Sequence, residues 1–392
     1  MAKNTVKVGI VGIGGYGRAL LELLLDEQQA GTAEISAAVV VDPAADASHL
    51  AFLKSGAPAC RIYRSWEELM TAGEKLQLMV LPVGIPFHAD LSVSSLAAGW
   101  NVLVEKPLAG SVADGLRIVE AEERSGRFVA VGYQDMYGEA VPEILSAISS
   151  GEIGAVERVS AFAIWGRPRS YYRRNTWAGR LYDAGRPVFD SPFNNALAHF
   201  LNMALVFAGD TRGNPARPLS AQAALFRRHA IESCDTASIR WATDSGAQVD
   251  VYFSHLTSRQ IGPHLQIHGS RGSIFWRVED CWELHSGGKP ALRRGVQTGP
   301  ELRKSMMRRV LQRASGEEVK VFTPRQALAH VEAVELAHRA AEIFTLPPGP
   351  VPAEEEWIEA DHLEEVMRSA RDANRLLCAQ SLAEPLRHTC SE

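Results

Sequence analysis

The chain has 392 residues, of which 46% are hydrophobic and 22% are charged, and this composition is ordinary for a folded protein of two or three domains. The formal net charge of −5 gives no electrostatic reason to expect nucleic acid or an anionic membrane as a partner. No apolar run approaches the length needed to cross a bilayer, and the start of the sequence lacks the pattern of a signal peptide. We therefore expect a cytoplasmic protein that acts on small molecules.

The first predicted element is a buried strand at residues 6–11, and a glycine-rich turn follows it directly. Gly12, Gly14 and Gly17 form a GxGxxG motif that leads into a helical run from Arg18. Such a turn brings backbone N–H groups and the positive end of a helix dipole to the diphosphate of a dinucleotide. The order of strand, turn and helix therefore indicates a dinucleotide cofactor.

A second strand, residues 35–41, ends at Asp42, where an acidic side chain can bond the adenosine ribose hydroxyls. A carboxylate at this place repels a 2′-phosphate, so the sequence favours NAD over NADP. The alternative interpretation is that Asp42 only opens a turn with Pro43.

Strands and helices then alternate to about residue 131, which predicts a parallel, doubly wound sheet. The expected strands are 76–83, 101–105 and 127–131, and the expected helices are 88–99 and 111–125. Ligands of such sheets bind beyond the carboxyl ends of the strands. Lys106 follows strand 101–105 at such an end, although a lysine in this position is usually a surface residue.

From about residue 153 the pattern changes to longer alternating strands, which predicts a mainly antiparallel sheet. The expected strands are 156–165, 237–242, 248–255, 265–268 and 273–276. We expect an α/β Rossmann domain with a doubly wound parallel sheet at 1–133, and an α+β domain for substrate binding and oligomerisation at 134–350. A helical C-terminal extension is expected at 351–392. Helical spacing within it is shown by Trp357, Ala360, Leu363, Met367 and Ala370.

Three polar residues interrupt an apolar helical pattern after Pro192. Asn195, His199 and Asn202 stand at i, i+4 and i+7, so one regular helix would place them on a single face, where they would meet polar partners or line a site. The preceding loop, residues 167–187, is rich in aromatic, Arg and Asn side chains, which suits either a polyol-binding lid or an ordinary interface loop. The Arg- and Lys-rich segment at 293–315 is interpreted as a solvated helical face.

Together the motifs resemble the Gfo/Idh/MocA family of NAD(P)-dependent oxidoreductases, which includes glucose–fructose oxidoreductase and inositol dehydrogenases. The resemblance lies in GIVGIGGYGR (9–18), VVDP (40–43), PVGIPFHADL (82–91), AAGWNVLVEKPLA (97–109), VAVGYQ (129–134) and SGEIGAV (150–156). It implies that Lys106 lies beside the substrate hydroxyl and the nicotinamide. It also aligns His199 with the histidine of the family's Asp-x-x-x-His pair and Asn195 with the aspartate. Because an amide cannot stabilise an imidazolium by charge, such an enzyme would tolerate a weaker base, rely more on Lys106, or recruit another acid such as Asp190.

The resemblance implies hydride transfer between NAD and a secondary hydroxyl of a sugar, an inositol or a sugar derivative, with NADP as the less favoured cofactor. The implied catalytic residues are Lys106, His199 and Asn195. The implied cofactor-binding residues are Gly12, Gly14, Gly17, Asp42, Pro82, His88 and Glu105. The implied substrate-binding residues are Tyr133, Arg174, Asn175 and Trp177. No metal is expected, and a homo-oligomer is implied.

Two alternatives use the same fold. An NAD-dependent glycosidase or lyase would oxidise its substrate transiently in the same site and recycle the hydride, and the departure at Asn195 leaves room for it. A sensor or repressor would bind NAD without turnover, although the presence of Lys106 and His199 argues against that role.

Overall fold

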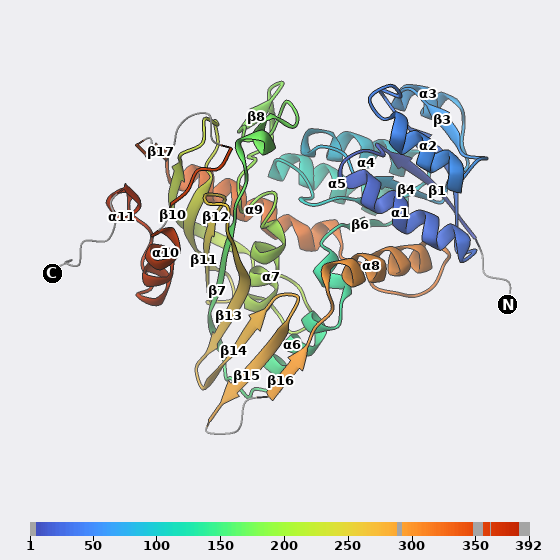
Figure 1. The fold of residues 1–392 in the computed structure, drawn as a ribbon. Helices are drawn as coiled ribbons and strands as arrows, with labels where there is room; N and C mark the ends of the chain where they lie inside the picture. The colour runs from blue at the N-terminus through green and yellow to red at the C-terminus, as the bar shows by residue number, and fades with distance from the viewer. Residues whose placement is uncertain (1–4, 288–291, 348–355, 361, 384–392) are drawn as a thin grey trace. The chain divides into compact units, whose positions relative to one another are not determined.

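The computed structural model describes residues 5–287, 292–347, 356–360 and 362–383, and Figure 1 shows their fold. The contacts divide the chain into two compact units. The first consists of Met1–Gly138 with Gly299–Leu328, and the second of Glu139–Thr298 with Ala329–Glu392. The sequence pattern assigned 299–328 to the second domain, whereas its contacts place it with the first unit.

The first unit is built on a six-stranded parallel sheet. The strands are β1 (Val6–Val11), β2 (Ala33–Val39), β3 (Arg61–Tyr63), β4 (Leu78–Leu81), β5 (Asn101–Val104) and β6 (Val129–Val131). Their order is β3-β2-β1-β4-β5-β6, so the direction of strand addition reverses at β1. Every residue of β4 and β5 is buried, as in a parallel sheet that is covered on both faces. The predicted doubly wound sheet is confirmed, and its ligands are expected at the reversal.

Apart from α8, which comes later in the chain, the helices of the first unit alternate with these strands. They are α1 (Tyr16–Gln29), α2 (Ala47–Gly56), α3 (Trp66–Thr71), α4 (His88–Ala97), α5 (Val112–Ser125) and α8 (Gly299–Ala314), with short 3-10 turns η1 (Ile85–Phe87) and η2 (Gln134–Tyr137). Local sequence sets the bounds of α5, because the Ser111 hydroxyl accepts a bond from the Asp114 N–H at 3.1 Å and Gly126, with a φ of 64°, ends the helix. A further helix, α9 (Pro324–Ala340), contains the boundary between the two units.

Helix α8 has the solvated basic face that its sequence predicted, and its other side is buried. It packs against α1 and η2. Its buried residues are Gly299, Leu302, Met306, Met307, Val310 and Leu311. The basic side chains Lys304 and Arg308 form ion pairs with Asp26 (3.8 Å) and Glu27 (3.1 Å) of α1. The positive charge of this helix therefore complements the acidic end of α1.

The second unit is built on a nine-stranded mixed sheet in the order β16-β15-β14-β13-β7-β12-β11-β10-β17. The strands are β7 (Val156–Trp165), β10 (Pro218–Arg227), β11 (Thr236–Thr243), β12 (Gln248–Ser254), β13 (Gln260–Gly269), β14 (Gly272–Arg277), β15 (Cys281–Ser286), β16 (Leu292–Gly295) and β17 (Ile343–Thr345). The pairs β7/β12 and β10/β17 are parallel, and the remaining pairs are antiparallel. The predicted mainly antiparallel sheet is therefore confirmed.

One face of this sheet is apolar and meets helices. Val159, Val251 and Leu265 alternate with residues of the other face and are fully buried. Helix α7 (Ala198–Ala208) packs against β7, β12 and β13, and the carbonyl of Ala333 in α9 accepts a hydrogen bond from the Trp241 indole at 3.0 Å. The second unit also contains α6 (Ala140–Ser149), the 3-10 turn η3 (Arg169–Arg173) and a small hairpin of β8 (Tyr182–Asp183) and β9 (Arg186–Pro187).

The other face carries polar and aromatic residues and is covered in part by the C-terminal segment 356–383, which contains α10 (Leu363–Asp372) and α11 (Ala379–Ala383). The apolar side chains of this contact are Phe162, Ile164, Phe226 and Tyr252 from the sheet, with Leu256, Leu346, Ile358, Ala360, Leu363, Val366, Met367, Ala370, Leu377 and Leu382.

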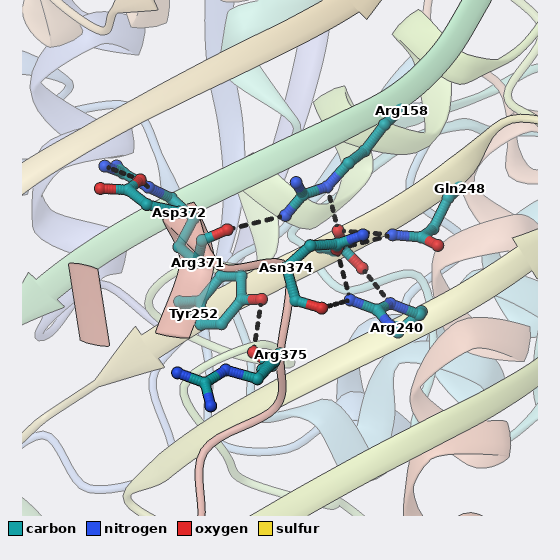
Figure 2. Close-up of polar contacts among 9 residues, drawn as sticks. Arg158, Arg240, Gln248, Tyr252, Arg371, Asp372, Asn374 and Arg375 are labelled. Carbon is teal, nitrogen blue, oxygen red and sulfur yellow. Dashed lines mark hydrogen bonds and ion pairs between the residues drawn. The ribbon is translucent and has the colours of Figure 1, made fainter. Parts of the chain in front are cut away.

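Polar contacts fix the same segment, as Figure 2 shows. Arg158 and Arg240 both pair with the buried carboxylate of Asp250. They also donate to the backbone carbonyls of Arg371 (3.3 Å) and Asn374 (2.9 Å) beyond the sheet. The C-terminal segment is therefore docked by directional bonds as well as by apolar area.

The helix of the extension begins later than the periodicity predicted. Trp357 and Ala360 precede α10, which starts at Leu363. The reason is that the chain before α10 bonds to neighbouring loops through its backbone, since the Ile358 carbonyl accepts from the Thr257 N–H at 2.8 Å. The implied homo-oligomer remains a prediction, and a second subunit would need a surface other than the part of the sheet that this segment covers.

Candidate active site

The glycine turn joins β1 to α1 at the reversal of the parallel sheet. Gly12 has a φ of +83°, which L side chains rarely adopt, and a Cβ at Gly17 would lie 2.5 Å from the Gly12 carbonyl oxygen. Helix α1 has neither a side-chain cap nor an acidic residue in its first turn. Its first N–H groups and its positive dipole end therefore suit an anionic group such as a diphosphate.

Apolar side chains are exposed around this turn. Tyr16 begins α1, Val41 follows β2, and Phe87 lies in η1 after β4. Val41 is 76% exposed, although it lies only two residues beyond the buried end of β2. Exposed apolar groups at one edge of a sheet often mark a ligand site, and flat nucleotide rings are ligands of suitable shape here.

The Asp42 side chain is exposed and shapes the loop after β2. Its Oδ1 atom accepts hydrogen bonds from the N–H groups of Ala44 (3.1 Å) and Ala45 (3.0 Å). This is the turn-opening role, which the sequence left as an alternative. Both bonds use Oδ1, so the turn does not engage Oδ2. Contact of Asp42 with a ribose is therefore compatible with the turn, and it stays a prediction.

Lys106 follows β5 and is half-buried, in the same unit as the glycine turn. Its backbone N–H donates to Glu105 Oε2 at 3.2 Å, and the following peptide bond to Pro107 is cis. The buried ring of His88 joins this segment to the end of β4, with Nδ1 2.7 Å from the Pro107 oxygen and Nε2 3.0 Å from the Val83 oxygen. His88 therefore positions the loop that carries Lys106.

Burial shifts the pKa values of His88 and Glu105, the two buried titratable side chains of the lysine loop, in opposite directions. Burial lowers the pKa of His88, although the two carbonyl oxygens favour its protonated form. Burial raises the pKa of the Glu105 carboxyl to about 7, against the opposing effect of the Lys106 ammonium. Contact of either side chain with a cofactor remains a prediction, and both are buried around the lysine loop.

Replacing Glu105 by Gln is expected to change the pH dependence of stability. The folded-state pKa of about 7 lies above the ordinary 4.5, so the folded protein holds this proton more tightly and stability falls as pH rises from about 4.5 to 7. We expect Glu105→Gln to be more stable than the parent by about 3 kcal/mol near pH 8 and equal to it near pH 4. Urea unfolding at both pH values measures this difference. A gain that is equal at both pH values, or a similar gain for the exposed Glu22→Gln, would contradict it.

Pro82 and Tyr133 are the remaining predicted residues of the first unit. The Pro82 ring lies beside the glycine turn, with its Cγ 3.2 Å from the place a Gly17 Cβ would occupy. Tyr133 is buried, and its ring meets Phe322 edge-on at 5.6 Å. This environment is that of a core aromatic residue, so the predicted contact of Tyr133 with substrate has no support in its packing.

In the second unit, the segment after Pro192 is not one helix. Helix α7 begins at Ala198, and the residues before it form turns in which the Leu197 N–H bonds the Pro192 carbonyl, five residues back, at 2.9 Å. Asn195 lies in these turns and His199 in the first turn of the helix. The predicted single polar face is therefore wrong in its geometry, because the wider bond interrupts the helical repeat.

Asn195 instead joins a small polar cluster around Asp190. Its Nδ2 donates to Asp190 Oδ1 at 2.7 Å and lies 3.4 Å from the Tyr171 hydroxyl. The buried Asp190 carboxylate also accepts from the Gly179 N–H at 2.6 Å and pairs with Arg174 at 3.7 Å. The acid that the sequence proposed as a partner is therefore in direct contact with the amide.

The loop 167–187 is ordered by its own side chains. The Arg174 guanidinium lies over the rings of Tyr171 (3.7 Å) and Trp177 (5.1 Å). Asn175 Oδ1 accepts from the N–H groups of Trp177 (3.2 Å) and Ala178 (2.8 Å). Arg174 thus belongs to the Asp190 cluster, whereas Asn175 shapes the loop. Substrate contact by these residues remains a prediction.

His199 is half-buried and Asn202 is fully buried in α7. Neither polar atom of the Asn202 amide has a hydrogen-bond partner among the described residues. Such a group costs about 1–3 kcal/mol unless water or a ligand bonds it. Asn195, Asp190, Arg174 and His199 lie in the second unit, and Lys106 lies in the first.

Within the described part of the chain, no group of three or more His, Cys, Asp or Glu side chains is arranged to hold a metal ion. None of the helices in that part has the length and apolar character needed to cross a membrane.

The sheet order, the glycine turn and the lysine loop define a protein of the nicotinamide-dependent oxidoreductase class. Residues 6–133 match the family described as oxidoreductases with an NAD-binding Rossmann fold, and residues 142–275 match its Gfo/Idh/MocA C-terminal domain. The chain belongs to the Gfo/Idh/MocA family.

The curated relatives include the inositol 2-dehydrogenase of Salmonella typhimurium (strain LT2), which is 32% identical over 151 residues. This match covers 38% of the chain and 43% of that enzyme, so the chain matches less than half of the relative's length.

Two solved structures share the fold at low identity. The WlbA dehydrogenase from Bordetella pertussis, in complex with NADH and UDP-GlcNAcA, has a TM-score of 0.72 at 19% identity and covers 87% of this chain and 96% of its own. KijD10, a 3-ketoreductase from Actinomadura kijaniata in complex with NADP and TDP-benzene, has a TM-score of 0.68 at 15% identity and covers 88% and 100%. Because one neighbour holds NADH and the other NADP, the fold does not decide between the cofactors.

Proposed function

We propose that the protein is a cytoplasmic NAD-dependent dehydrogenase that oxidises or re-forms a secondary hydroxyl of a sugar, an inositol or a sugar derivative. The observation that carries the proposal is the placement of Lys106 at the carboxyl end of β5, in a loop held by His88, within the unit that bears the glycine turn. The inositol 2-dehydrogenase relative supports a polyol as substrate.

The residues of the first unit fit a nicotinamide dinucleotide. The glycine turn and the start of α1 would hold its diphosphate, and Tyr16, Val41 and Phe87 offer apolar contacts to its rings. Asp42 would accept from the ribose hydroxyls. The cofactor would supply the hydride acceptor.

The protein side chains would handle the substrate oxygen and its proton. The Lys106 ammonium would donate to that oxygen and stabilise its alkoxide character. His199 would accept the hydroxyl proton, because an imidazole ring nitrogen can act as a general base. Asn195 is bonded to Asp190, so it would orient substrate or His199 without ionising.

Substrate turnover tests this proposal. The protein would be incubated with NAD or NADP and with a panel of inositols, hexoses, hexuronates and sugar phosphates, and the absorbance of reduced nicotinamide would be followed. We expect reduction with at least one of these alcohols. Release of an aglycone from a glycoside without net reduction would favour the hydride-recycling alternative, and cofactor binding without any turnover would favour the sensor.

Asp42 is expected to set the preference for NAD. We expect Asp42→Ala to weaken NAD binding by about tenfold and to narrow its advantage over NADP, because a charged hydrogen bond contributes about 1.5–3 kcal/mol and the repulsion of a 2′-phosphate is lost. Titration of both cofactors by fluorescence measures the change, and Asp26→Ala in α1 is the matched control. Tighter binding of NADP by the unmodified protein would show that the assignment is wrong.

A further inference from the structure

A cavity of about 570 Å³ lies in the second unit, and most of its lining residues have no role in the site described above. Two segments form its wall, residues 169–180 before β8 and residues 229–232 after β10. Its charged and polar lining consists of Arg169, Tyr172, Arg173, Arg180, His229 and Glu232. Three arginines against one glutamate give the lining a net positive charge, which points to an anionic ligand.

His229 lines this cavity and is held by a buried carboxylate. Its Nδ1 lies 2.9 Å from Asp235 Oδ2, which also accepts from the backbone N–H groups of Arg228 and His229 at 2.8 Å each. Burial alone would raise the pKa of Asp235, but the hydrogen bonds from His229 and Arg228 hold it below its usual range. Asp235 is therefore ionised, and Nδ1 of His229 carries a proton.

Two further polar atoms of this wall have no hydrogen-bond partner within the described residues. His229 Nε2 and the Tyr172 hydroxyl are buried and unbonded there, and the two rings lie 4.8 Å apart. Buried polar atoms of this kind cost about 1–3 kcal/mol each unless a ligand or water bonds them. Both atoms are able to donate to an anion, Nε2 when the imidazole is protonated.

A hydrolytic role for the His229–Asp235 pair is less consistent with its surroundings. The nearest nucleophile in sequence is Cys234, and burial raises the pKa of its thiol, which keeps it protonated. The arginines favour binding of an anion instead. Arg173 forms an exposed ion pair with Glu356 at 3.4 Å, which is weak, and Arg180 is exposed. Guanidinium groups bind carboxylates and phosphates through paired N–H bonds.

The cavity wall is bonded to the proposed active site within the same unit. Gly179 lines the cavity, and its N–H donates to Asp190 at 2.6 Å, which in turn accepts from Asn195 at 2.7 Å. The Gly179 carbonyl accepts from the N–H groups of Glu232 (3.0 Å) and Ser233 (2.8 Å) on the opposite wall. Gly179 therefore connects a group bound in the cavity to the Asp190 cluster.

We propose that this cavity binds an anionic substituent of the substrate, a carboxylate or a phosphate, so that the enzyme acts on an acidic sugar derivative. Arg169, Arg173 and Arg180 supply the charge, and His229 and Tyr172 supply further donors. The identity of the ligand as a sugar rests on the proposed function, whereas the anion site itself does not.

Calorimetric titration of the full chain without nicotinamide tests the site, with glucose, glucuronate and glucose 6-phosphate as ligands. We expect at least one of the two acidic sugars to bind and glucose to bind at least tenfold more weakly. The variants Arg180→Ala and His229→Gln should each bind the acidic ligand about tenfold more weakly than the parent, since a charge-assisted hydrogen bond contributes about 1.5–3 kcal/mol. The exposed Arg294 of β16 lies outside the cavity, so Arg294→Ala is the matched control and should bind like the parent.

The outcomes separate this site from the proposed function. Binding of an acidic sugar that is lost in Arg180→Ala supports the site even if no alcohol is oxidised. A preference for glucuronate indicates a carboxylate, and a preference for glucose 6-phosphate indicates a phosphate. Equal binding of all three ligands, or acidic-ligand binding that Arg180→Ala leaves unchanged, overturns the inference even if turnover is found. Because His229→Gln removes a buried partner of Asp235, the melting temperature of this variant is measured alongside. If His229→Gln is unfolded, the result with Arg180→Ala alone decides whether the site exists.

Discussion

The Lys106→Met variant is expected to lose about 10²–10³-fold in kcat, because it removes the ammonium donor from the oxygen on which negative charge develops. The methionine side chain is similar in length and uncharged, so the loop held by His88 keeps its packing. NAD affinity should stay within a few-fold of the parent, since the lysine acts on the substrate oxygen and the glycine turn holds the dinucleotide. Initial rates with an alcohol that the substrate panel shows to be oxidised, together with a fluorescence titration of NAD, measure the two quantities.

A matched control separates this effect from a general loss of a positive charge. Lys304 of α8 lies in the same unit, is about half exposed, and pairs with Asp26 at 3.8 Å. We expect Lys304→Met to keep the kcat of the parent. An unchanged kcat in Lys106→Met as well would return Lys106 to the role of a surface lysine.

Replacing His199 by Ala is expected to remove the limb of the pH profile in which kcat/KM rises with increasing pH. It should also lower kcat by about 10²–10⁴-fold, the usual contribution of a positioned general base. The limb reports the proton that the base must release before it can accept one from the hydroxyl. His285 of β15 has a half-exposed side chain, so His285→Ala is the control and should keep the limb. If the limb persists in His199→Ala, this histidine is a structural residue and not the base.

The Asn195→Asp variant adds a second readout of the same site. A carboxylate at this place would support an imidazolium and move the limb to higher pH if His199 lies within its reach. It would also face Asp190 at hydrogen-bond distance, where two carboxylates cannot both ionise easily and one of them holds a proton. We therefore expect a loss of stability at neutral pH that is recovered in acid. A limb that stays in place would exclude coupling between residue 195 and the base.

Much of the fold could be predicted because its strands are long and buried. The strands at 6–11 and 156–165 were predicted with the bounds that the structure shows. The short elements α2, β3 and α3 between residues 47 and 71 were not predicted. β3 has three residues, which is too few for a period, and it forms only by pairing with β2 at the edge of the sheet. Its existence depends on tertiary contact, which local sequence does not show.

The site could be predicted in part for a related reason. Lys106 and Asn195 stand in recognisable motifs, but Asn195 was expected on a helix that in fact begins at Ala198. The Asp190 cluster and the His229–Asp235 pair lie in irregular loops and turns, where the residues have no helical or strand repeat, so no spacing rule finds them. The exposure of Val41 is likewise a property of the folded edge. The sequence does hold one signal for this exposure, because Val41 stands directly before Asp42, the acidic residue that follows the second strand.

The docked C-terminal segment has a consequence for synthesis of the chain. The ribosome completes β7 to β17 before it makes residues 356–383, so the face that bears Phe162, Phe226 and Tyr252 is finished before its cover exists. At about 5–20 residues per second this face stays uncovered for seconds, and exposed apolar surface of this kind promotes aggregation during folding. We expect the nascent chain to bind chaperones most strongly in that interval and to be released when Arg158 and Arg240 engage the arriving backbone.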